Sequence, residues 1–431
     1  MRRTLWCVAL LFAVWCCKGL WDLWSYHRNR FQVQETETVI VSADNPLKGR
    51  LPFWQVDSSK VAIALYDLTA GETVFEQQAE RLMIPASCMK LLTAVTALKR
   101  LGPNAPFESR LLAYGDIHHG TLYGDLIFEG DDDPLFESFE PLVQALQRKG
   151  VQRIEGDVVL DLARCDTLRA HHTASPWDIH YGKLPLLLRG EPFVRRTLLY
   201  ELSRAGITVK PRPVGASLPA LDGLPRRIRL NSMEEHATVL ATERHPLHSV
   251  LAPMLIHSSN IKAESVLWHV DNPFYRWGAS QICDAQRPAS SLWTFIREEM
   301  PKEDTAGFVI NDGSGLSPDN RLTARFLVRL LVYAWDDESI REVLLKEALA
   351  TPAHPVRRGS LTFRMSAPLF KNRVFCKTGT LTTRGASSLA GYIHSENGHW
   401  YAFSIINEDT PVWDARQFQD RICRLVIEKP L

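Results

Sequence analysis

The pattern of apolar and polar positions predicts a strand hairpin and then a helix near the start of the chain. Residues 61–69 alternate weakly and are rich in β-formers, and residues 73–75 follow across a glycine turn, which is typical of a β-hairpin. Residues 87–100 carry apolar side chains at helical spacing, and Gly102-Pro103 ends this predicted helix.

The C-terminal part of the chain likewise combines strand-like and helical patterns. Its pattern predicts three strands and a final helix, at residues 373–377, 387–394, 400–407 and 412–427. Asn397-Gly398 is typical of a tight turn between the last two strands.

The middle of the chain differs from both ends. Strands are predicted at residues 120–130 and 158–161 and a helix at 139–148, before a proline-rich stretch that runs to about residue 235. A length of 431 residues suits two or three domains. We therefore expect an α+β protein with an antiparallel sheet flanked by helices. Its main domain, residues 35–100 and 240–431, is built from both ends of the chain, and a smaller α/β domain is inserted at 101–239.

Composition and the N-terminus indicate an exported globular protein. Apolar residues make up 45% of the chain and charged residues 23%, and a net charge of +1 gives no reason to expect a nucleic-acid partner. Arg2 and Arg3 precede an apolar run at residues 4–17, which has the length of a signal h-region. We expect residues 1–30 to be a signal peptide or, if uncleaved, an inner-membrane anchor, with the rest of the protein in the periplasm. The residues indicate no oligomeric state.

Five cysteines lie beyond this leader, too few and too scattered for a full disulfide framework: Cys88, Cys165, Cys283, Cys376 and Cys423. One disulfide remains open, and no Cys/His spacing is typical of zinc. We expect neither a metal nor an organic cofactor.

Ser87 and Lys90 form the first of three short motifs with catalytic chemistry. They stand three residues apart at the start of a predicted helix, so both side chains project from one face. Lys90 can accept the serine proton if burial or a neighbouring cation keeps part of it neutral. For this motif alone the alternative, a capping serine beside a surface lysine, is the favoured interpretation.

Lys377-Thr378-Gly379, the second motif, lies on a predicted strand. A lysine there can hold a substrate carboxylate, Thr378 can donate a further hydrogen bond, and Gly379 lets a peptide approach the strand edge. The alternative is a β-turn between strands.

Ser258-Ser259-Asn260, the third motif, lies at a connection between two apolar helical runs. Ser258 could relay a proton to a leaving group and Asn260 could hold the acyl-side amide. A capping serine is the alternative, and a second S-x-N at residues 395–397, explained by a hairpin turn, shows how readily the pattern arises.

The surroundings of these motifs resemble the class C low-molecular-mass penicillin-binding proteins, which are serine D-Ala-D-Ala carboxypeptidases and endopeptidases of the bacterial envelope. The resemblance begins near residue 60, keeps the family's motif order and is most specific at Asp312-Gly313-Ser314-Gly315-Leu316-Ser317. The other similar stretches are residues 84–93, 124–126, 132–134, 156–161, 319–323, 377–381 and 387–392.

This resemblance implies a penicillin-binding transpeptidase/β-lactamase-like domain and assigns the roles in its site. It implies that Ser87 is the acylated nucleophile, Lys90 its base and Ser258 a third catalytic side chain. It implies substrate binding by Asn260, Lys377, Thr378, Gly379 and Thr380. The backbone N–H groups of Ser87 and Thr380 would form the oxyanion hole. The implied substrates are peptidoglycan stem peptides, with β-lactam antibiotics as covalent inhibitors.

The chain departs from the family in the motif around Ser258 and in the length of the insertion. Ser259 stands where the family usually has Asp, and fewer residues than usual separate Lys90 from Ser258. The shorter insertion leaves the balance between carboxypeptidase and endopeptidase activity open. Cys88 and Cys376 adjoin motif residues, but strand alternation should point Cys376 away from the site. A β-lactamase or esterase on the same fold, and a catalytically weak wall-binding scaffold protein, are the alternatives.

Overall fold

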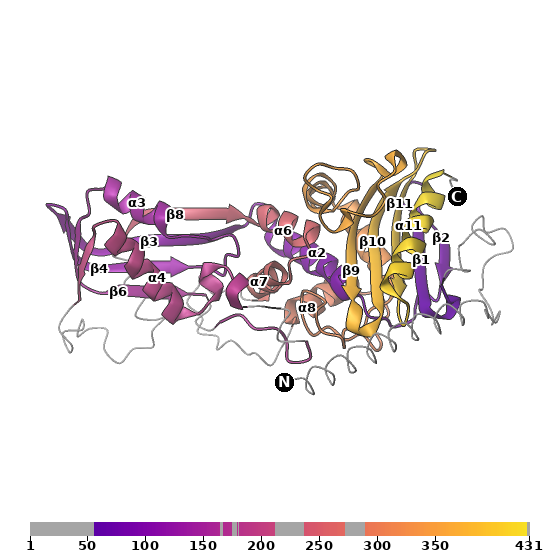
Figure 1. The fold of residues 1–431 in the computed structure, drawn as a ribbon, viewed down its shortest axis with the longest axis horizontal. Helices are drawn as coiled ribbons and strands as arrows, with labels where there is room; N and C mark the ends of the chain where they lie inside the picture. Colours follow the sequence, from indigo (N-terminus) through magenta and orange to yellow (C-terminus); the bar gives the residue numbers. More distant parts are fainter. Residues whose placement is uncertain are drawn as a thin grey trace, which may run out of the picture.

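A five-stranded antiparallel sheet joins the two ends of the chain. In the computed structural model, which describes residues 56–163, 167–174, 179, 181–211, 237–271 and 289–428, its strand order is β2-β1-β11-β10-β9 (Figure 1). The strands are β1 (Val61–Asp67), β2 (Glu72–Gln77), β9 (Val374–Leu381), β10 (Ala386–His394) and β11 (Trp400–Asn407). The prediction of an antiparallel sheet built from both ends of the chain is confirmed.

Helices cover both faces of this sheet. One face is covered by α11 (Val412–Glu428), and the opposite face by a group of helices that lies between the two ends of the molecule (Figure 1). The group consists of α2 (Met89–Leu101), α6 (Leu247–Ile256), α7 (Asn260–Asp271), α8 (Ser290–Glu299), α9 (Ala324–Asp336) and α10 (Glu338–Glu342). Along β1, Ile63 faces the core beneath α11, whereas Ala62 and Ala64 face the helical group. Because both faces are covered, apolar residues stand on both, which explains the weak alternation in the sequence.

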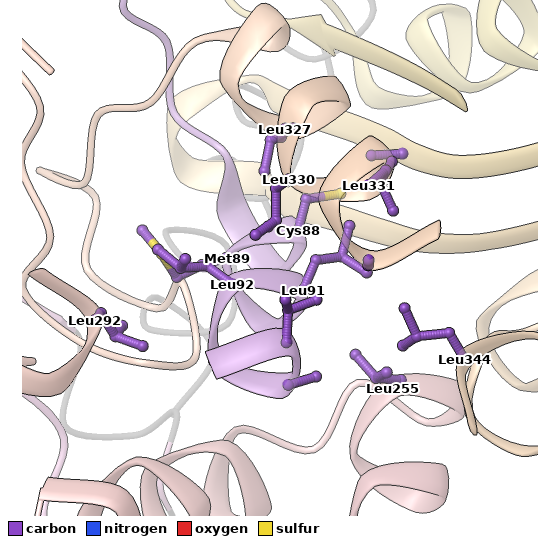
Figure 2. Close-up of a cluster of buried hydrophobic side chains, with 14 of the residues drawn as sticks. Cys88, Met89, Leu91, Leu92, Leu255, Leu292, Leu327, Leu330, Leu331 and Leu344 are labelled. Carbon is purple, nitrogen blue, oxygen red and sulfur yellow. The ribbon is translucent and has the colours of Figure 1, made fainter. Parts of the chain in front are cut away.

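The α2 helix lies at the centre of the larger core. Its residues are buried without interruption from Met89 to Leu98, so the apolar stripe expected from the sequence extends around the whole helix. Figure 2 shows Leu91 and Leu92 among leucines of the surrounding helices, including Leu255 of α6 and Leu292 of α8. The strands and these helices enclose α2, which leaves it no solvent-facing side along this length.

A second sheet lies at the opposite end of the molecule (Figure 1). It contains β3 (Pro106–His118), β4 (Thr121–Gly130), β5 (Arg153–Glu155), β6 (Val158–Leu162), β7 (Thr208–Lys210) and β8 (Thr238–Pro246). Strand β3 is antiparallel to β4 and β8, whereas β5 and β6 run parallel to β4. Leucines of α3 (Glu140–Arg148) and α4 (Glu191–Arg204) complete its core, which makes this unit α/β as expected. The sheet continues to Pro246, and the division of the chain at residues 101 and 239 stays a prediction.

Short helical turns connect these elements. They are η1 (Ser58–Lys60), η2 (Ala86–Cys88), η4 (Tyr181–Lys183), η5 (Leu186–Leu188), η7 (Val343–Ala348), η8 (Gly359–Leu361), η9 (Pro368–Phe370) and η10 (Thr382–Arg384). Residues 1–30, Cys165 and Cys283 lie outside the described residues. Within the described ranges, no helix combines the length and apolar character needed to cross a membrane.

Candidate active site

Ser87 lies in the η2 turn that leads into α2, and Lys90 follows on the first turn of that helix. Lys90 Nζ donates a hydrogen bond of 2.9 Å to Ser87 Oγ. Ser87 is partly exposed, whereas Lys90 is fully buried. Ala86, just before the serine, has a left-handed φ of 44°, a conformation that non-glycine residues adopt at some cost. The pair therefore combines an accessible hydroxyl with an enclosed amine.

The amine of Lys90 is hydrogen-bonded to three oxygen atoms. Besides Ser87, it donates to Asn260 Oδ1 at 2.8 Å and to the backbone oxygen of Ser314 at 2.5 Å. Burial and the nearby Lys377 hold the pKa of Lys90 well below its ordinary value. The environment thus favours the neutral amine, which is the form that can accept a proton.

Lys377 of β9 and Ser258 form a second amine–hydroxyl pair. Lys377 Nζ donates to Ser258 Oγ at 2.8 Å and to the backbone oxygen of Thr378 at 2.6 Å. Burial lowers the pKa of Lys377 to about 8. Ser258 has a φ of 58°, and it is Ser259 whose hydroxyl accepts a bond from the backbone N–H of Lys262 in the first turn of α7. The neighbouring serine therefore makes the capping contact, while Ser258 contacts Lys377.

Two glycines allow the backbone segments of the site to approach one another. A Cβ at Gly379 would lie 2.9 Å from the backbone nitrogen of Ser87 and 2.1 Å from Ser388 Oγ. A Cβ at Gly315, where φ is +76°, would lie 1.8 Å from the backbone oxygen of Ala86. Side chains at these positions would displace the turn that carries the serine.

The threonines of β9 have partners that the sequence did not indicate. Thr378 Oγ1 donates to Ser360 Oγ at 2.8 Å, and Arg416 of α11 donates to Thr380 Oγ1 at 3.0 Å. Arg416 places a guanidinium beside the threonine expected to help bind a carboxylate. Ser360 and Arg416 belong to none of the three motifs. They could not be assigned from sequence, because only the folded chain brings η8 and α11 to the end of β9.

A second group outside the three short motifs is the acidic pair Glu264 and Asp312, of which Asp312 begins the stretch that resembles the family most specifically. Asp312 accepts bonds from the backbone nitrogens of Gly315 and Ser317 and from Asn320 Nδ2, which closes the turn after Ile310. Glu264 Oε1 accepts the backbone N–H of Ser314 at 2.9 Å. Glu264 stands four residues after Asn260 on α7, so helical spacing was the available signal for it.

The cysteines of the site are buried thiols. Cys88 Sγ donates to the backbone oxygen of Lys377 at 3.2 Å, and burial raises the pKa of the Cys88 thiol. Cys376 packs into the core beneath α11, on the sheet face opposite the site, as strand alternation predicts. Among the described residues, no cluster of three or more His, Cys, Asp or Glu side chains is arranged to hold a metal ion.

The second sheet and its connections reach the site at two places. One face of α7 holds the loop at residues 131–134, through the contacts Lys262 Nζ to Pro134 O, Ser265 Oγ to Asp132 O and His269 Nδ1 to Asp131 Oδ1. Leu168, Leu184 and Leu188 pack with Leu316 and against Ile261. Thr173 Oγ1 also lies 2.6 Å from Ser317 Oγ. These contacts border the turn and the helix end that position the partners of Lys90.

Comparisons with known proteins identify the class. The model of the D-Ala-D-Ala carboxypeptidase 3 (S13) family matches residues 54–185 and 223–428, so the chain belongs to this family. The chain is 24% identical over 425 residues to D-alanyl-D-alanine carboxypeptidase DacB of Haemophilus influenzae, covering 80% of this chain and 85% of that protein. It is 24% identical over 426 residues to a D-alanyl-D-alanine carboxypeptidase of Actinomadura, covering 80% and 77%.

Solved structures agree on the fold. The crystal structure of penicillin-binding protein 4 from Haemophilus influenzae superposes with a TM-score of 0.66 at 18% identity, covering 86% of this chain and all of the other. A predatory endopeptidase from Bdellovibrio bacteriovorus, in complex with an immunity protein, gives a TM-score of 0.54 at 16% identity, covering 85% and 93%. The predicted serine DD-peptidase class and its penicillin-binding fold are confirmed.

Proposed function

We propose that this protein is a serine D-alanyl-D-alanine carboxypeptidase and/or DD-endopeptidase that cleaves peptidoglycan stem peptides through an acyl-enzyme on Ser87. The observation that carries this proposal is the pairing of two buried lysines with two partly exposed serines, Lys90 with Ser87 and Lys377 with Ser258. Such pairs supply a base for the nucleophile and a proton donor for the leaving group. Family membership supports the same chemistry.

Lys90 is oriented to act as the base. A neutral amine has two N–H donors and one lone pair, and two of the three partners of Lys90, Asn260 Oδ1 and Ser314 O, are acceptors only. These two oxygens hold the N–H bonds, so the lone pair is directed at the hydroxyl of Ser87. Ser87 Oγ then attacks the carbonyl carbon of the penultimate D-alanine while its proton passes to Lys90.

The oxyanion and the carboxylate of the substrate are held by β9 and the serine turn. We assign the oxyanion hole to the backbone N–H groups of Ser87 and Thr380, because Gly379 brings β9 close to the Ser87 nitrogen. The terminal carboxylate is assigned to Lys377, Thr378 and Thr380, close to the guanidinium of Arg416.

Ser258 completes the proton transfers. It protonates the leaving amine nitrogen and receives a replacement proton from Lys377, its donor at 2.8 Å. In deacylation, water occupies the place of the amine and gives its proton back to Lys377 through Ser258, while Ser87 recovers its proton from Lys90. Both lysines thus return to their starting states after each turnover.

The location follows from the substrate and from the leader. Peptidoglycan lies outside the cytoplasm, and the apolar segment within residues 1–30 has the features of an export signal. We propose a periplasmic enzyme that is either released by cleavage of this segment or attached to the inner membrane by it. β-Lactams, as acyl donors with a carboxylate, are proposed to acylate the same serine.

Labelling with a fluorescent penicillin tests this function. The purified protein should be labelled at Ser87, as located by peptide mass spectrometry, and should release D-alanine from an acyl-Lys-D-Ala-D-Ala peptide. Ser87→Ala should abolish both, while the free energy of unfolding changes by less than about 1 kcal/mol, as is usual for a small, partly exposed side chain. Ser259→Ala is the matched control and should retain labelling. Folded wild-type protein without label at Ser87 would contradict the mechanism.

A further inference from the structure

Glu264 is a charged side chain beside the proposed nucleophile to which neither the motifs nor the proposed mechanism gives a role. It lies on α7, one helical turn after Asn260, and it is partly buried. Its carboxylate does not contact Ser87. It is connected to the site through Ser314. The peptide groups before and after this residue are each hydrogen-bonded at both the N–H and the carbonyl oxygen.

The first of these peptide groups joins Gly313 to Ser314. Its carbonyl oxygen accepts a bond of 2.7 Å from Thr93 Oγ1 of α2, and its N–H donates to Glu264 Oε1 at 2.9 Å. The second group joins Ser314 to Gly315. Its N–H donates to Asp312 Oδ1 at 2.7 Å, and its carbonyl oxygen accepts from Lys90 Nζ. Glu264 therefore binds the N–H of Ser314, and Lys90 binds the carbonyl oxygen of the same residue.

Charge also links Glu264 to Lys90. The ionisable groups that face Lys90 are Lys377 of β9, Asp312 of the turn, Glu264 of α7 and Cys88 of η2. Asp312 accepts three hydrogen bonds within its turn, whereas Glu264 accepts from Ser314. Burial and the neighbouring Asp312 raise the pKa of Glu264 above its usual range.

We propose that Glu264 is a positioning residue for acylation, which holds the Ser314 carbonyl against Lys90 and whose ionisation state changes the fraction of Lys90 that is neutral. This inference rests on the proposed role of Lys90 as base. An ionised Glu264 stabilises the ammonium form of Lys90, and a protonated Glu264 does not. The same carboxyl therefore acts on the geometry of the base and on its charge.

Two substitutions separate the effect of Glu264 on the position of the Ser314 carbonyl from its effect on the charge of Lys90. Glu264→Gln keeps an oxygen that can accept the Ser314 N–H but removes the charge. The acid limb of the labelling rate at Ser87, measured against pH, should therefore move to lower pH, because the ammonium of Lys90 loses a stabilising neighbour. Glu264→Ala removes both, and labelling should slow by about tenfold or more across the whole pH range, as for the loss of one charge-assisted hydrogen bond.

Glu303→Gln is the matched control. Glu303 is also partly buried, and burial raises its pKa, but the charged group that acts on it is Arg329 rather than Lys90. This variant should keep the wild-type profile. An acid limb of Glu264→Gln that coincides with the wild type, or that moves to higher pH, would overturn the inference while labelling at Ser87 persists. Wild-type protein that is not labelled at Ser87 would instead overturn the proposed function.

Discussion

The two ends of the molecule bury apolar cores in the same way but differ in the lysine side chains that they bury. At the five-stranded sheet, Lys90 and Lys377 are fully buried and donate to defined oxygen atoms. At the second sheet the buried charged residues are acidic, such as Asp125 of β4 and Asp133 of the loop after it, whereas the cation Arg244 is 64% exposed. Surface pairs contribute little to stability, whereas buried lysines carry a desolvation cost. Among the described residues, the fully buried lysines are the two that the proposed chemistry uses as a base and as a proton donor.

Left-handed backbone conformations occur at both ends of the molecule, and His119 in the turn between β3 and β4 is a non-glycine example at the second sheet. Ala86 and Ser258 adopt left-handed conformations beside the reacting groups. In the second sheet's end of the molecule, glycines such as Gly150 take up this conformation at a turn with open space around it. Strain at non-glycine positions is expected where the surrounding structure forces a reacting group into place.

The largest effect is expected from Gly315→Ala compared with Gly150→Ala. The two glycines have nearly the same φ, +76° and +80°, but a Cβ would meet the Ala86 oxygen at Gly315 and nothing within 4 Å at Gly150. Gly150→Ala should cost about 1–2 kcal/mol for the left-handed conformation alone, with labelling unchanged. Gly315→Ala should cost more and slow labelling by about 100-fold, because the serine turn moves.

Chemical denaturation and labelling rates of the folded fraction measure both quantities. Equal labelling rates in the two variants would show that the contact between Gly315 and Ala86 does not position the serine.

A smaller effect is expected from Leu188→Ala compared with Leu202→Ala. Both leucines are fully buried, Leu188 in the cluster that contains Leu316 and Leu202 in the core of the second sheet. Each substitution should destabilise the protein by about 2–5 kcal/mol through the cavity that it leaves. Only Leu188→Ala should also slow labelling, by up to about tenfold, because its cluster borders the turn that holds Lys90.

These rates are to be measured on folded protein, at temperatures where both variants are native. If Leu202→Ala slowed labelling as much as Leu188→Ala, the second sheet as a whole, rather than the cluster around Leu316, would support the site.

The smallest effect concerns the basic limb of peptide hydrolysis. The pKa of Lys377 is lowered to about 8, and the lysine is a cation below this value. Because the proposed carboxylate anchor needs the cation, kcat/KM should fall as pH rises through about 8, as this parameter follows the free enzyme. Lys377→Arg should lower kcat/KM, because arginine cannot give a proton to Ser258, and the remaining activity should show its basic limb at higher pH, since arginine stays protonated.

Lys262→Met is the control for this limb. Burial also lowers the pKa of Lys262, but its amine binds the Pro134 oxygen at the junction with the second sheet. The basic limb should persist in this variant. If the basic limb vanished in Lys262→Met and was unchanged in Lys377→Arg, the titrating group would be Lys262 at the junction rather than Lys377.

Much of the fold near the site was predictable from local pattern. The strands β10 and β11, the helix α11 and the turn at Asn397-Gly398 follow from spacing along a few neighbouring residues, and all four are found. The helical stripe at α2 was predicted as one face, although the helix is buried on every side to Leu98. Periodicity records the residue types of a segment, whereas the number of buried faces depends on what packs around it.

The candidate site also has a part that local sequence predicts and a part that depends on tertiary packing. The sequence alone predicted Ser87 and Lys90 as the reacting pair, and because they are one helical turn apart, their contact depends only on local geometry. The tertiary structure alone decided which oxygens orient Lys90, how close β9 comes to the serine turn, and that Glu264, Ser360 and Arg416 belong to the site. These contacts join residues far apart along the chain, and their distances and shifted pKa values arise from burial, which exists only once the elements have packed together.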